Sequence, residues 1–195
     1  MVTIVDYGSG NLRSVQKAFE RLGAAARITS DPEVVAAAER IVLPGVGSFG
    51  DAMRALRDRQ LVDPLVAHVR ADKPFFGICM GLQLLFETGL EGGRHSGLGV
   101  LAGEVARFEL PAGFKVPHMG WNTVRWRGPP VADGWYYFVH SYRARPADES
   151  VVAAVADYGG EFCAAVARGR LFATQFHPEK SQATGLRLLG AFLDA

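Results

Sequence analysis

The sequence predicts an α/β fold with three layers, in which a mostly parallel central sheet is flanked by helices and carries additional antiparallel strands. Short apolar runs alternate with helical patterns over residues 1–87, and this alternation is typical of βαβ units. After residue 97 the pattern changes to short strand-like runs separated by Gly, Pro and Asp, which favour hairpins. The length of 195 residues suits a single domain spanning residues 1–195.

Each strand of the predicted parallel part is a short apolar run that ends at turn residues. Strands are expected at residues 1–6, 25–29, 40–43 and 74–78. The first helix is indicated by Leu12, Val15, Phe19 and Leu22, which recur at helical spacing after a possible cap at Asn11. Further helices are predicted from Ser30 or Asp31 to residue 39, and over residues 50–59, 61–71 and 80–87.

The predicted antiparallel part consists of five strand-like runs, at residues 98–110, 115–126, 135–143, 151–158 and 162–167. Another apolar strand over residues 171–176 precedes a last helix, which starts at Ser181 and ends near residue 192. Residues 91–97 form the most loop-like segment and show no obvious chemistry. His68 and His95 are expected at the surface.

The composition excludes several classes of protein. The 21 basic and 20 acidic residues leave a net charge of +1, which argues against binding of nucleic acid or of an anionic membrane. No apolar run approaches the roughly 18 residues of a membrane span, and no signal peptide is visible. The two cysteines exclude a disulfide scaffold and favour a reducing cytoplasm. The five histidines are scattered, so no metal site or cofactor is expected.

The sharpest motif is FFGICMGLQ at residues 75–83, which predicts a nucleophile elbow with Cys79 at the turn between a strand and a helix. A side chain exposed at so tight a turn has a strained backbone, so Gly77 and Gly81 beside it must be small. The following helix points its amide donors and the positive end of its dipole at the sulfur, which favours the thiolate. The alternative is a buried structural cysteine.

A second motif, QFHPEKS at residues 175–181, supplies a base for such a thiol. Pro178 biases His177 away from the helical region, and on an extended chain His177 and Glu179 share a face. The carboxylate would then fix the imidazole tautomer. The alternative is a strand-to-helix turn with a solvated Glu. Both motifs follow predicted parallel strands, whose carboxyl ends form the usual site of an open α/β sheet.

Two glycine-rich turns complete the candidate sites. Backbone N–H groups near Gly45, Val46 and Gly47, together with that of Met80, could form an oxyanion hole, although an ordinary loop is the alternative for this segment. The turn GSGN at residues 8–11 resembles a phosphate-binding turn. Because it lacks the complete GxGxxG and GxxxxGK[ST] patterns, we do not expect nucleotide binding there.

The motifs around Cys79 and His177, GICMGLQLLF and QFHPEKS, resemble those of the class I glutamine amidotransferases, which are Cys-His-Glu glutaminases. Within that family the chain resembles the glutaminase subunits of imidazole glycerol phosphate synthase from end to end. The segments that carry this closer resemblance are IVDYGSGNLRSV, LPGVGSFGDAM, VPHMGWN, FVHSYR and FATQFHPEKS.

The resemblance implies a role for each site residue. Cys79 attacks the side-chain amide of L-glutamine, and His177 shuttles protons with Glu179 behind it. Ammonia is released, and water cleaves a γ-glutamyl thioester to glutamate. The implied oxyanion donors are the Gly45–Gly47 segment and Met80, and the residues implied to hold the substrate are Gln83, Gly47, Ser141 and Tyr142.

The resemblance also implies a partner, a (β/α)8-barrel cyclase subunit that forms a heterodimer with this chain and uses the ammonia in L-histidine biosynthesis. Lys180 could pair with an acidic group of that partner, or be a solvated lysine. Asn11, Trp121 and Tyr137 could line the interface or gate the ammonia exit. Burial is the expected alternative for the two aromatic residues.

Other functions stay open at this point. The chain could serve another class I amidotransferase, for anthranilate, aminodeoxychorismate or pyridoxal phosphate synthesis. It could be a non-catalytic, flavodoxin-like binding domain, in which case Cys79→Ala would leave its function intact. It could also be a stand-alone Cys-His hydrolase that turns over without a partner. Cys163, which lies in a strand pattern, is expected to be an inert buried thiol.

Overall fold

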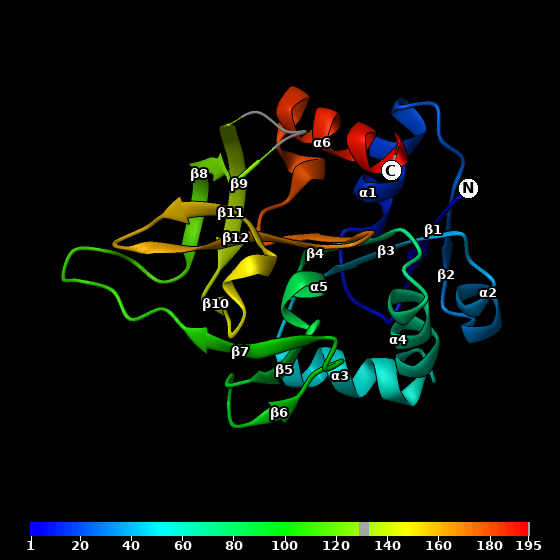
Figure 1. The fold of residues 1–195 in the computed structure, drawn as a ribbon, viewed down its shortest axis with the longest axis horizontal. Helices are drawn as coiled ribbons and strands as arrows, with labels where there is room; N and C mark the ends of the chain where they lie inside the picture. The colour runs from blue at the N-terminus through cyan, green and yellow to red at the C-terminus, as the bar shows by residue number, and fades with distance from the viewer. Residues whose placement is uncertain (129–132, 195) are drawn as a thin grey trace.

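The computed structural model describes residues 1–128 and 133–194 and contains, within these ranges, two sheets (Figure 1). The main sheet has nine strands, in the order β2 (Ala26–Thr29), β1 (Val2–Val5), β3 (Arg40–Gly45), β4 (Phe75–Cys79), β13 (Leu171–Thr174), β12 (Glu161–Arg168), β11 (Val152–Asp157), β8 (His118–Trp126) and β9 (Gly134–His140). The smaller sheet has the order β10 (Tyr142–Pro146), β7 (Leu101–Arg107), β5 (Phe86–Gly89) and β6 (His95–Ser96).

The strands from β2 to β13 are parallel, and those from β13 to β9 pair in antiparallel fashion. This confirms the predicted parallel core with antiparallel additions. The register aligns Gly45 with Cys79 and Thr174 with Ile78, so β3, β4 and β13 end at one edge of the sheet. The expectation of a single domain covers residues 129–132 and 195, which lie outside the described ranges, and it stays a prediction.

Helices cover both faces of the main sheet. They are α1 (Leu12–Arg21), α2 (Pro32–Ala36), α3 (Phe49–Asp58), α4 (Val62–Arg70), the short α5 (Met80–Gln83) and α6 (Gln182–Asp194), with 3-10 turns η1 (Glu149–Val151) and η2 (Pro178–Lys180). In Figure 1, α1 and α6 lie together on one side of the sheet, and α2, α3 and α4 lie on the other. Each side has its own apolar core, one including Phe19 and Phe192, the other Leu56 and Leu65.

The start of α2 shows which of two candidate residues caps it. The Asp31 carboxylate accepts hydrogen bonds from the backbone N–H groups of Glu33 and Val34, as an N-cap does. Asn11 occupies the N-cap position of α1, but its side chain makes no capping hydrogen bond, so the predicted cap at that residue is wrong in its chemistry.

The helix predicted over residues 80–87 is confirmed in its first half and wrong in its second half. Only Met80–Gln83 is helical, and Phe86–Gly89 forms β5. The backbone N–H groups of Leu98, Val100 and Leu101 donate to carbonyls of Leu84 and Leu85, and β5 then pairs with β7. These long-range hydrogen bonds outweigh the helical preference of a short apolar run.

The strand predicted over residues 135–143 is two strands in different sheets. The strand β9 ends at His140 and pairs with β8, and β10 begins at Tyr142 and pairs with β7. Ser141 lies between them, so the chain crosses from one sheet to the other at this residue. The crossing places residues 139–142 beside the carboxyl end of β4, as the contacts of Cys79 below make plain.

Some placements of single residues were also wrong. His68 is buried, only 3% exposed, because its Nε2 bonds to the Pro74 carbonyl at 3.0 Å. The segment 91–97 includes strand β6, and its Glu91 carboxylate accepts a hydrogen bond from the Phe49 N–H at 2.8 Å.

Within residues 1–128 and 133–194, no helix is both long enough and apolar enough to cross a membrane.

Candidate active site

Cys79 stands at the turn between β4 and α5, with a strained backbone of φ 55° and ψ −104°. The two neighbouring glycines make this turn possible. A Cβ on Gly81 would lie 1.8 Å from the Leu43 carbonyl oxygen, and one on Gly77 would lie 2.8 Å from the Gly81 carbonyl oxygen. Both distances are shorter than any tolerable contact, so the predicted elbow and its need for glycine are confirmed.

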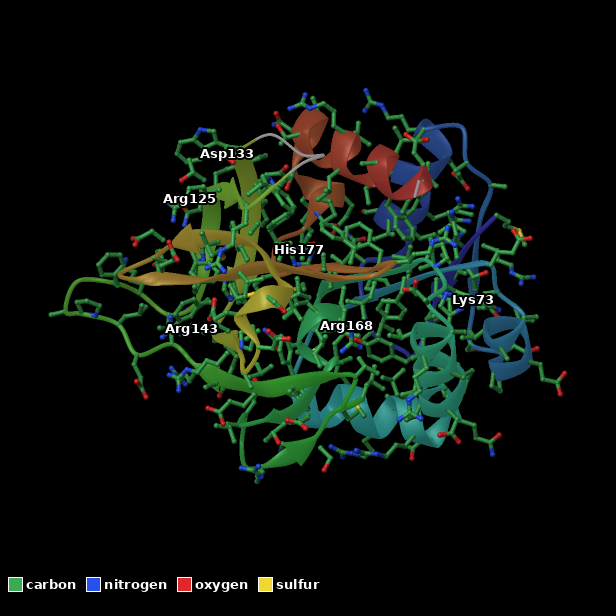
Figure 2. All side chains as sticks on the ribbon, in the orientation of Figure 1. Lys73, Arg125, Asp133, Arg143, Arg168 and His177 are labelled. Carbon is green, nitrogen blue, oxygen red and sulfur yellow. The ribbon has the colours of Figure 1, made fainter. Side chains whose placement is uncertain are left out.

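His177 reaches the same edge of the sheet from β13. Its backbone is extended, with φ −100° and ψ 96°, and Pro178 begins the 3-10 turn η2 behind it. The His177 N–H donates to the Tyr137 carbonyl at 2.9 Å, and the Ser181 hydroxyl donates to the His177 carbonyl at 2.6 Å. These two hydrogen bonds hold the His177 backbone at both its N–H and its carbonyl group. Figure 2 shows His177 near the middle of the molecule.

The predicted pairing of His177 with Glu179 is present. His177 Nδ1 and Glu179 Oε1 lie 2.8 Å apart, and the two side chains are 2% and 1% exposed. The pairing uses the 3-10 turn, whereas the sequence predicted an extended chain. Nε2 of His177 is buried without a hydrogen-bond partner among the described residues, and this nitrogen is the one left to exchange a proton with a reacting group.

The electrostatics of the site couple His177 to Cys79. Burial lowers the pKa of His177, but the charge of Cys79, followed by the hydrogen bond and charge of Glu179, outweighs burial and raises that pKa to about 10. The ring therefore holds a proton readily when the sulfur is negative. A protonated imidazole beside a thiolate can protonate a leaving amine, which is the chemistry of a nucleophilic cysteine with an acid–base partner.

Gln175 is a site residue that the sequence reasoning missed, although it stands in the motif around His177. Its side chain is fully buried, and Nε2 donates to the Cys79 sulfur at 3.7 Å. Its Oε1 accepts a hydrogen bond from Gln83 Nε2 at 3.0 Å. The Cys79 thiol in turn points at the Val139 carbonyl, 3.9 Å away.

A cavity of about 300 Å³ opens beside Cys79. It is lined by most of the predicted oxyanion and substrate residues, namely Val46, Gly47, Met80, Gln83, Ser141 and Tyr142. The sequence reasoning missed four further lining residues, Glu91, Pro117, Val139 and His140. The cavity volume suits a small polar molecule, with the sulfur in its wall.

Gly45, which was predicted as an oxyanion donor, does not line the cavity. A Cβ on Gly45 would lie 1.8 Å from the Tyr7 hydroxyl. Tyr7 is buried, and its hydroxyl has no hydrogen-bond partner among the described residues. Burial, followed by the charge of Cys79, raises the pKa of this phenol. Tyr7 thus packs against the end of β3 at Gly45. Any residue with a Cβ would clash with its hydroxyl at this position.

Three of the predicted interface residues form one cluster, which we call the β9 patch: Trp121, Tyr137 and Lys180. The rings of Trp121 and Tyr137 pack edge to face with centroids 6.0 Å apart, and Lys180 Nζ lies 5.9 Å from the Tyr137 centroid. Trp121 is 44% exposed, so burial was the wrong alternative for this tryptophan. Asn11 lies at the exposed start of α1, a helix that contacts η2 and hence the turn of Lys180.

Comparison with known proteins agrees with this geometry. The family model described as glutamine amidotransferase class-I matches residues 3–194. The chain belongs to this family. Its curated relatives include an imidazole glycerol phosphate synthase subunit HisH from Rhodopirellula baltica, 62% identical over all of this chain and 98% of the relative. A subunit HisH from Syntrophotalea carbinolica is 54% identical over the whole of both chains.

Solved structures show the same fold at lower identity. A crystal structure of a glutamine amidotransferase has a TM-score of 0.79 at 24% identity, covering 100% of this chain and 98% of that one. The structure of PurLQS from Thermotoga maritima has a TM-score of 0.77 at 20% identity, covering 99% and 97%. The α/β three-layer fold of this class I glutamine amidotransferase is therefore confirmed.

Residues 1–128 and 133–194 contain no cluster of three or more His, Cys, Asp or Glu side chains that could hold an ion.

The amidotransferase also buries a pair of histidines, His118 and His140, whose titration predicts an acid-sensitive fold. Burial lowers the pKa of His118 to about 4 and that of His140 to about 3. Below the ordinary pKa of about 6.5, the unfolded chain takes up protons that the folded chain refuses. The stability that depends on these two neutral rings is therefore fully present above pH 6.5 and is lost as the pH falls toward 4.

We expect the free energy of unfolding in urea to fall between pH 6.5 and 4, by at most about 1.4 kcal/mol per pH unit for each ring. The double variant His118→Phe/His140→Phe should show a smaller dependence of the unfolding free energy on pH, because it removes both titratable imidazoles. An equal slope in the double variant would mean that these rings do not control the acid sensitivity.

Proposed function

We propose that this chain is the glutaminase subunit of an imidazole glycerol phosphate synthase, which hydrolyses L-glutamine and supplies ammonia to a (β/α)8-barrel cyclase in L-histidine biosynthesis. The observation that carries the proposal is the His177–Glu179 pair at 2.8 Å, whose ring is coupled electrostatically to Cys79, together with the cavity of about 300 Å³ that Cys79 lines. The end-to-end similarity to subunits named HisH supports the choice of synthase.

The proposed reaction begins with attack of the Cys79 sulfur on the side-chain amide carbon of glutamine, while His177 holds the thiol proton on Nε2. The carbonyl oxygen becomes an oxyanion, for which the N–H groups of Met80 and the Gly45–Gly47 segment are the proposed donors. His177 then protonates the amide nitrogen, the C–N bond breaks, and ammonia leaves. The product on the enzyme is a γ-glutamyl thioester.

The second half of the reaction uses water. His177, now neutral, takes a proton from water as the water oxygen attacks the thioester carbon. The C–S bond breaks, the sulfur regains its charge beside the imidazolium, and glutamate leaves. Glu179 stays ionised throughout and holds the ring by Nδ1, a role supported by the 2.8 Å contact.

The proposed substrate contacts are Gln83, Gly47, Ser141 and Tyr142, all of which line the cavity. The Gln83 amide already donates to the Tyr142 carbonyl at 3.1 Å and to Gln175 Oε1 at 3.0 Å. Its NH2 group is thus used within the protein, which leaves the Gln83 carbonyl oxygen as the group to accept a hydrogen bond from the substrate.

The proposed partner surface consists of the β9 patch and Asn11. It lies beside the turn η2, which follows His177. Exposed apolar side chains beside it support this, because Met119 is 59% exposed on the same strand as Trp121. Exposed aromatic residues and methionine are enriched at interface centres, and Lys180 beside Tyr137 supplies a positive charge for an acidic group of the partner. We propose a cytoplasmic heterodimer, in which ammonia leaves between this surface and the barrel.

The partner can be tested by mixing the purified chain with the cyclase barrel and measuring glutamine turnover with and without the nucleotide-like cyclase substrate. We expect strong stimulation by the barrel and its substrate, and none by an anthranilate or pyridoxal phosphate synthase. Stimulation by one of those synthases alone would reject the assignment. High turnover by the lone chain would instead favour a stand-alone hydrolase.

Lys180→Glu should raise the dissociation constant of the complex about 10-fold or more, because it reverses a charge at the centre of the proposed interface. Isothermal titration measures this change. Lys73→Glu is the matched control, since Lys73 lies far from His177 in Figure 2 and bonds to the Ala38 carbonyl. Equal affinities for the two variants would contradict the proposed surface.

A further inference from the structure

The histidine pair, His118 and His140, occupies directly facing positions of β8 and β9. Both side chains are buried, at 3% and 6% exposure, and His118 Nδ1 lies 3.0 Å from His140 Nε2. Phe138 and Tyr158 stack on the His118 ring, with centroid distances of 4.8 and 4.1 Å. Of the two, only His140 lines the cavity beside Cys79, and the proposed reaction uses neither ring.

The hydrogen-bond partners of the pair determine which nitrogens carry protons. His140 Nδ1 lies 2.8 Å from the Tyr142 carbonyl, which can only accept, so this nitrogen donates. With both rings neutral, as burial favours, His140 Nε2 accepts from His118 Nδ1. His118 Nε2 then accepts from Asn122 Nδ2 at 3.3 Å. Every ring nitrogen has a partner of the correct kind.

The Asn122 amide is itself oriented. Its Nδ2 donates to the Asp157 carbonyl at 2.8 Å, and its Oδ1 accepts from the Thr123 N–H at 2.8 Å. The chain of donors therefore has one direction, from Asn122 through the histidine pair to the Tyr142 carbonyl. A second proton on either ring would place two N–H groups against each other and break it.

The Tyr142 carbonyl extends this series of hydrogen bonds to Cys79. Tyr142 O also accepts from Gln83 Nε2 at 3.1 Å, and the other hydrogen of that NH2 group reaches Gln175 Oε1 at 3.0 Å. With its oxygen so held, the Gln175 amide must present Nε2 to the Cys79 sulfur, at 3.7 Å. A negative sulfur gains from an N–H donor, whereas its other close neighbour, the Val139 carbonyl, can only accept.

We propose that His118 and His140 are positioning residues of the glutaminase, which hold the Tyr142 carbonyl and thereby orient Gln83 and the Gln175 amide that donates to the Cys79 sulfur. The inference rests on the proposed function, since it concerns the same sulfur. Its competitor is a pair of histidines that only fill the core between Phe138, Tyr158 and Phe108.

Two variants of His140 separate hydrogen bonding from packing. His140→Phe keeps an aromatic ring but donates nothing to Tyr142, while His140→Asn keeps an N–H group near the place of Nδ1. The matched control is His68→Phe, because His68 is also buried and bonds to one backbone carbonyl, that of Pro74, but it lies on α4 and does not line the cavity. Kinetics are measured in the complex with the barrel, and melting temperatures are measured in parallel.

We expect His140→Phe to lower kcat/KM for glutamine roughly 10- to 100-fold, since a small misplacement of reacting groups has that effect. His140→Asn should recover about 10-fold of this loss even if it is the less stable variant, and His68→Phe should stay within about 2-fold of the unaltered enzyme. Equal activities of the Phe and Asn variants, or a loss that follows melting temperature across all three, would overturn the proposal.

A second measurement covers the case in which His140→Phe does not fold. Gln175→Met has similar volume and no N–H donor, and it should slow alkylation of Cys79 by iodoacetamide at neutral pH about 10-fold, as mass spectrometry of the Cys79 peptide would record. An unchanged rate would overturn the role of Gln175 as donor. Because alkylation needs no glutamine, this result stands apart from the proposed function, which fails instead if the unaltered complex releases no ammonia.

Discussion

Replacement of Cys79 by alanine is expected to abolish glutamine hydrolysis, with kcat falling by roughly four orders of magnitude or more, because no other group in the cavity wall can form the thioester. The assay is release of glutamate and ammonia in the presence of the barrel. The fold should survive, since Cys79 is buried at a turn where alanine is smaller and adds no contact.

Cys163→Ala is the matched control for that variant. Cys163 lies in β12, and burial raises the pKa of its thiol to about 12, so it is not ionised at neutral pH. We expect this variant to keep its activity. Turnover by Cys79→Ala, or its loss in Cys163→Ala, would show that the wrong cysteine has been assigned.

Gly81→Ala should destabilise the fold more than any other addition of a single methyl group near the site. The added Cβ would meet the Leu43 carbonyl oxygen at 1.8 Å, and this oxygen belongs to the backbone of β3, which cannot yield as a flexible side chain would. We expect a loss of about 3 kcal/mol or more in the free energy of unfolding, together with loss of glutaminase activity as the elbow moves away from β3.

Gly190→Ala provides the control for the methyl group itself. Gly190 lies within α6, and a Cβ there meets nothing within 4 Å. This variant should gain about 0.5–1 kcal/mol, since alanine favours helix. Unfolding in urea measures the free energy of unfolding of the unaltered protein, of Gly81→Ala and of Gly190→Ala. If Gly81→Ala is as stable as Gly190→Ala, the elbow is not confined by β3 as described.

The parallel half of the fold was predictable because its signals are local. The apolar runs, helical spacing and turn residues of residues 1–79 gave strands and helices close to their observed bounds. The elbow was predictable because the pattern Gly-x-Cys-x-Gly stands within five positions of sequence, although the atom that excludes a side chain at Gly81 is the distant Leu43 carbonyl oxygen of β3. The pairing of His177 with Glu179 also needed only a short segment.

The errors lie where distant segments decide the structure. Residues 84–89 bond to residues 98–105, which no local pattern reveals, so a helix was predicted there. The break at Ser141 depends on the two sheets that meet there. Gln175 was missed because its contacts with Gln83 and Cys79 join three separate segments, although its place two residues before His177 was a signal that could have found it.

Burial of single polar or aromatic residues was the least predictable feature. His68 is buried where the Pro74 carbonyl meets its ring, and Trp121 is exposed on β8 between the half-buried Gly120 and Asn122. In both cases the side chain's environment comes from the way two elements meet. A motif that resembles a family can place such a residue in a role, but its exposure follows only from the fold.

The central claim is that the Cys79 sulfur becomes covalently attached to the side-chain amide carbon of glutamine as a γ-glutamyl thioester. Acid quenching of the working complex with isotopically labelled glutamine, followed by mass spectrometry of its peptides, tests this most directly. We predict one labelled glutamyl group on the peptide containing Cys79, accumulating further when His177→Asn slows its removal by water. Label on Cys163, or ammonia release at full rate with no labelled peptide at any quench time, would contradict the account.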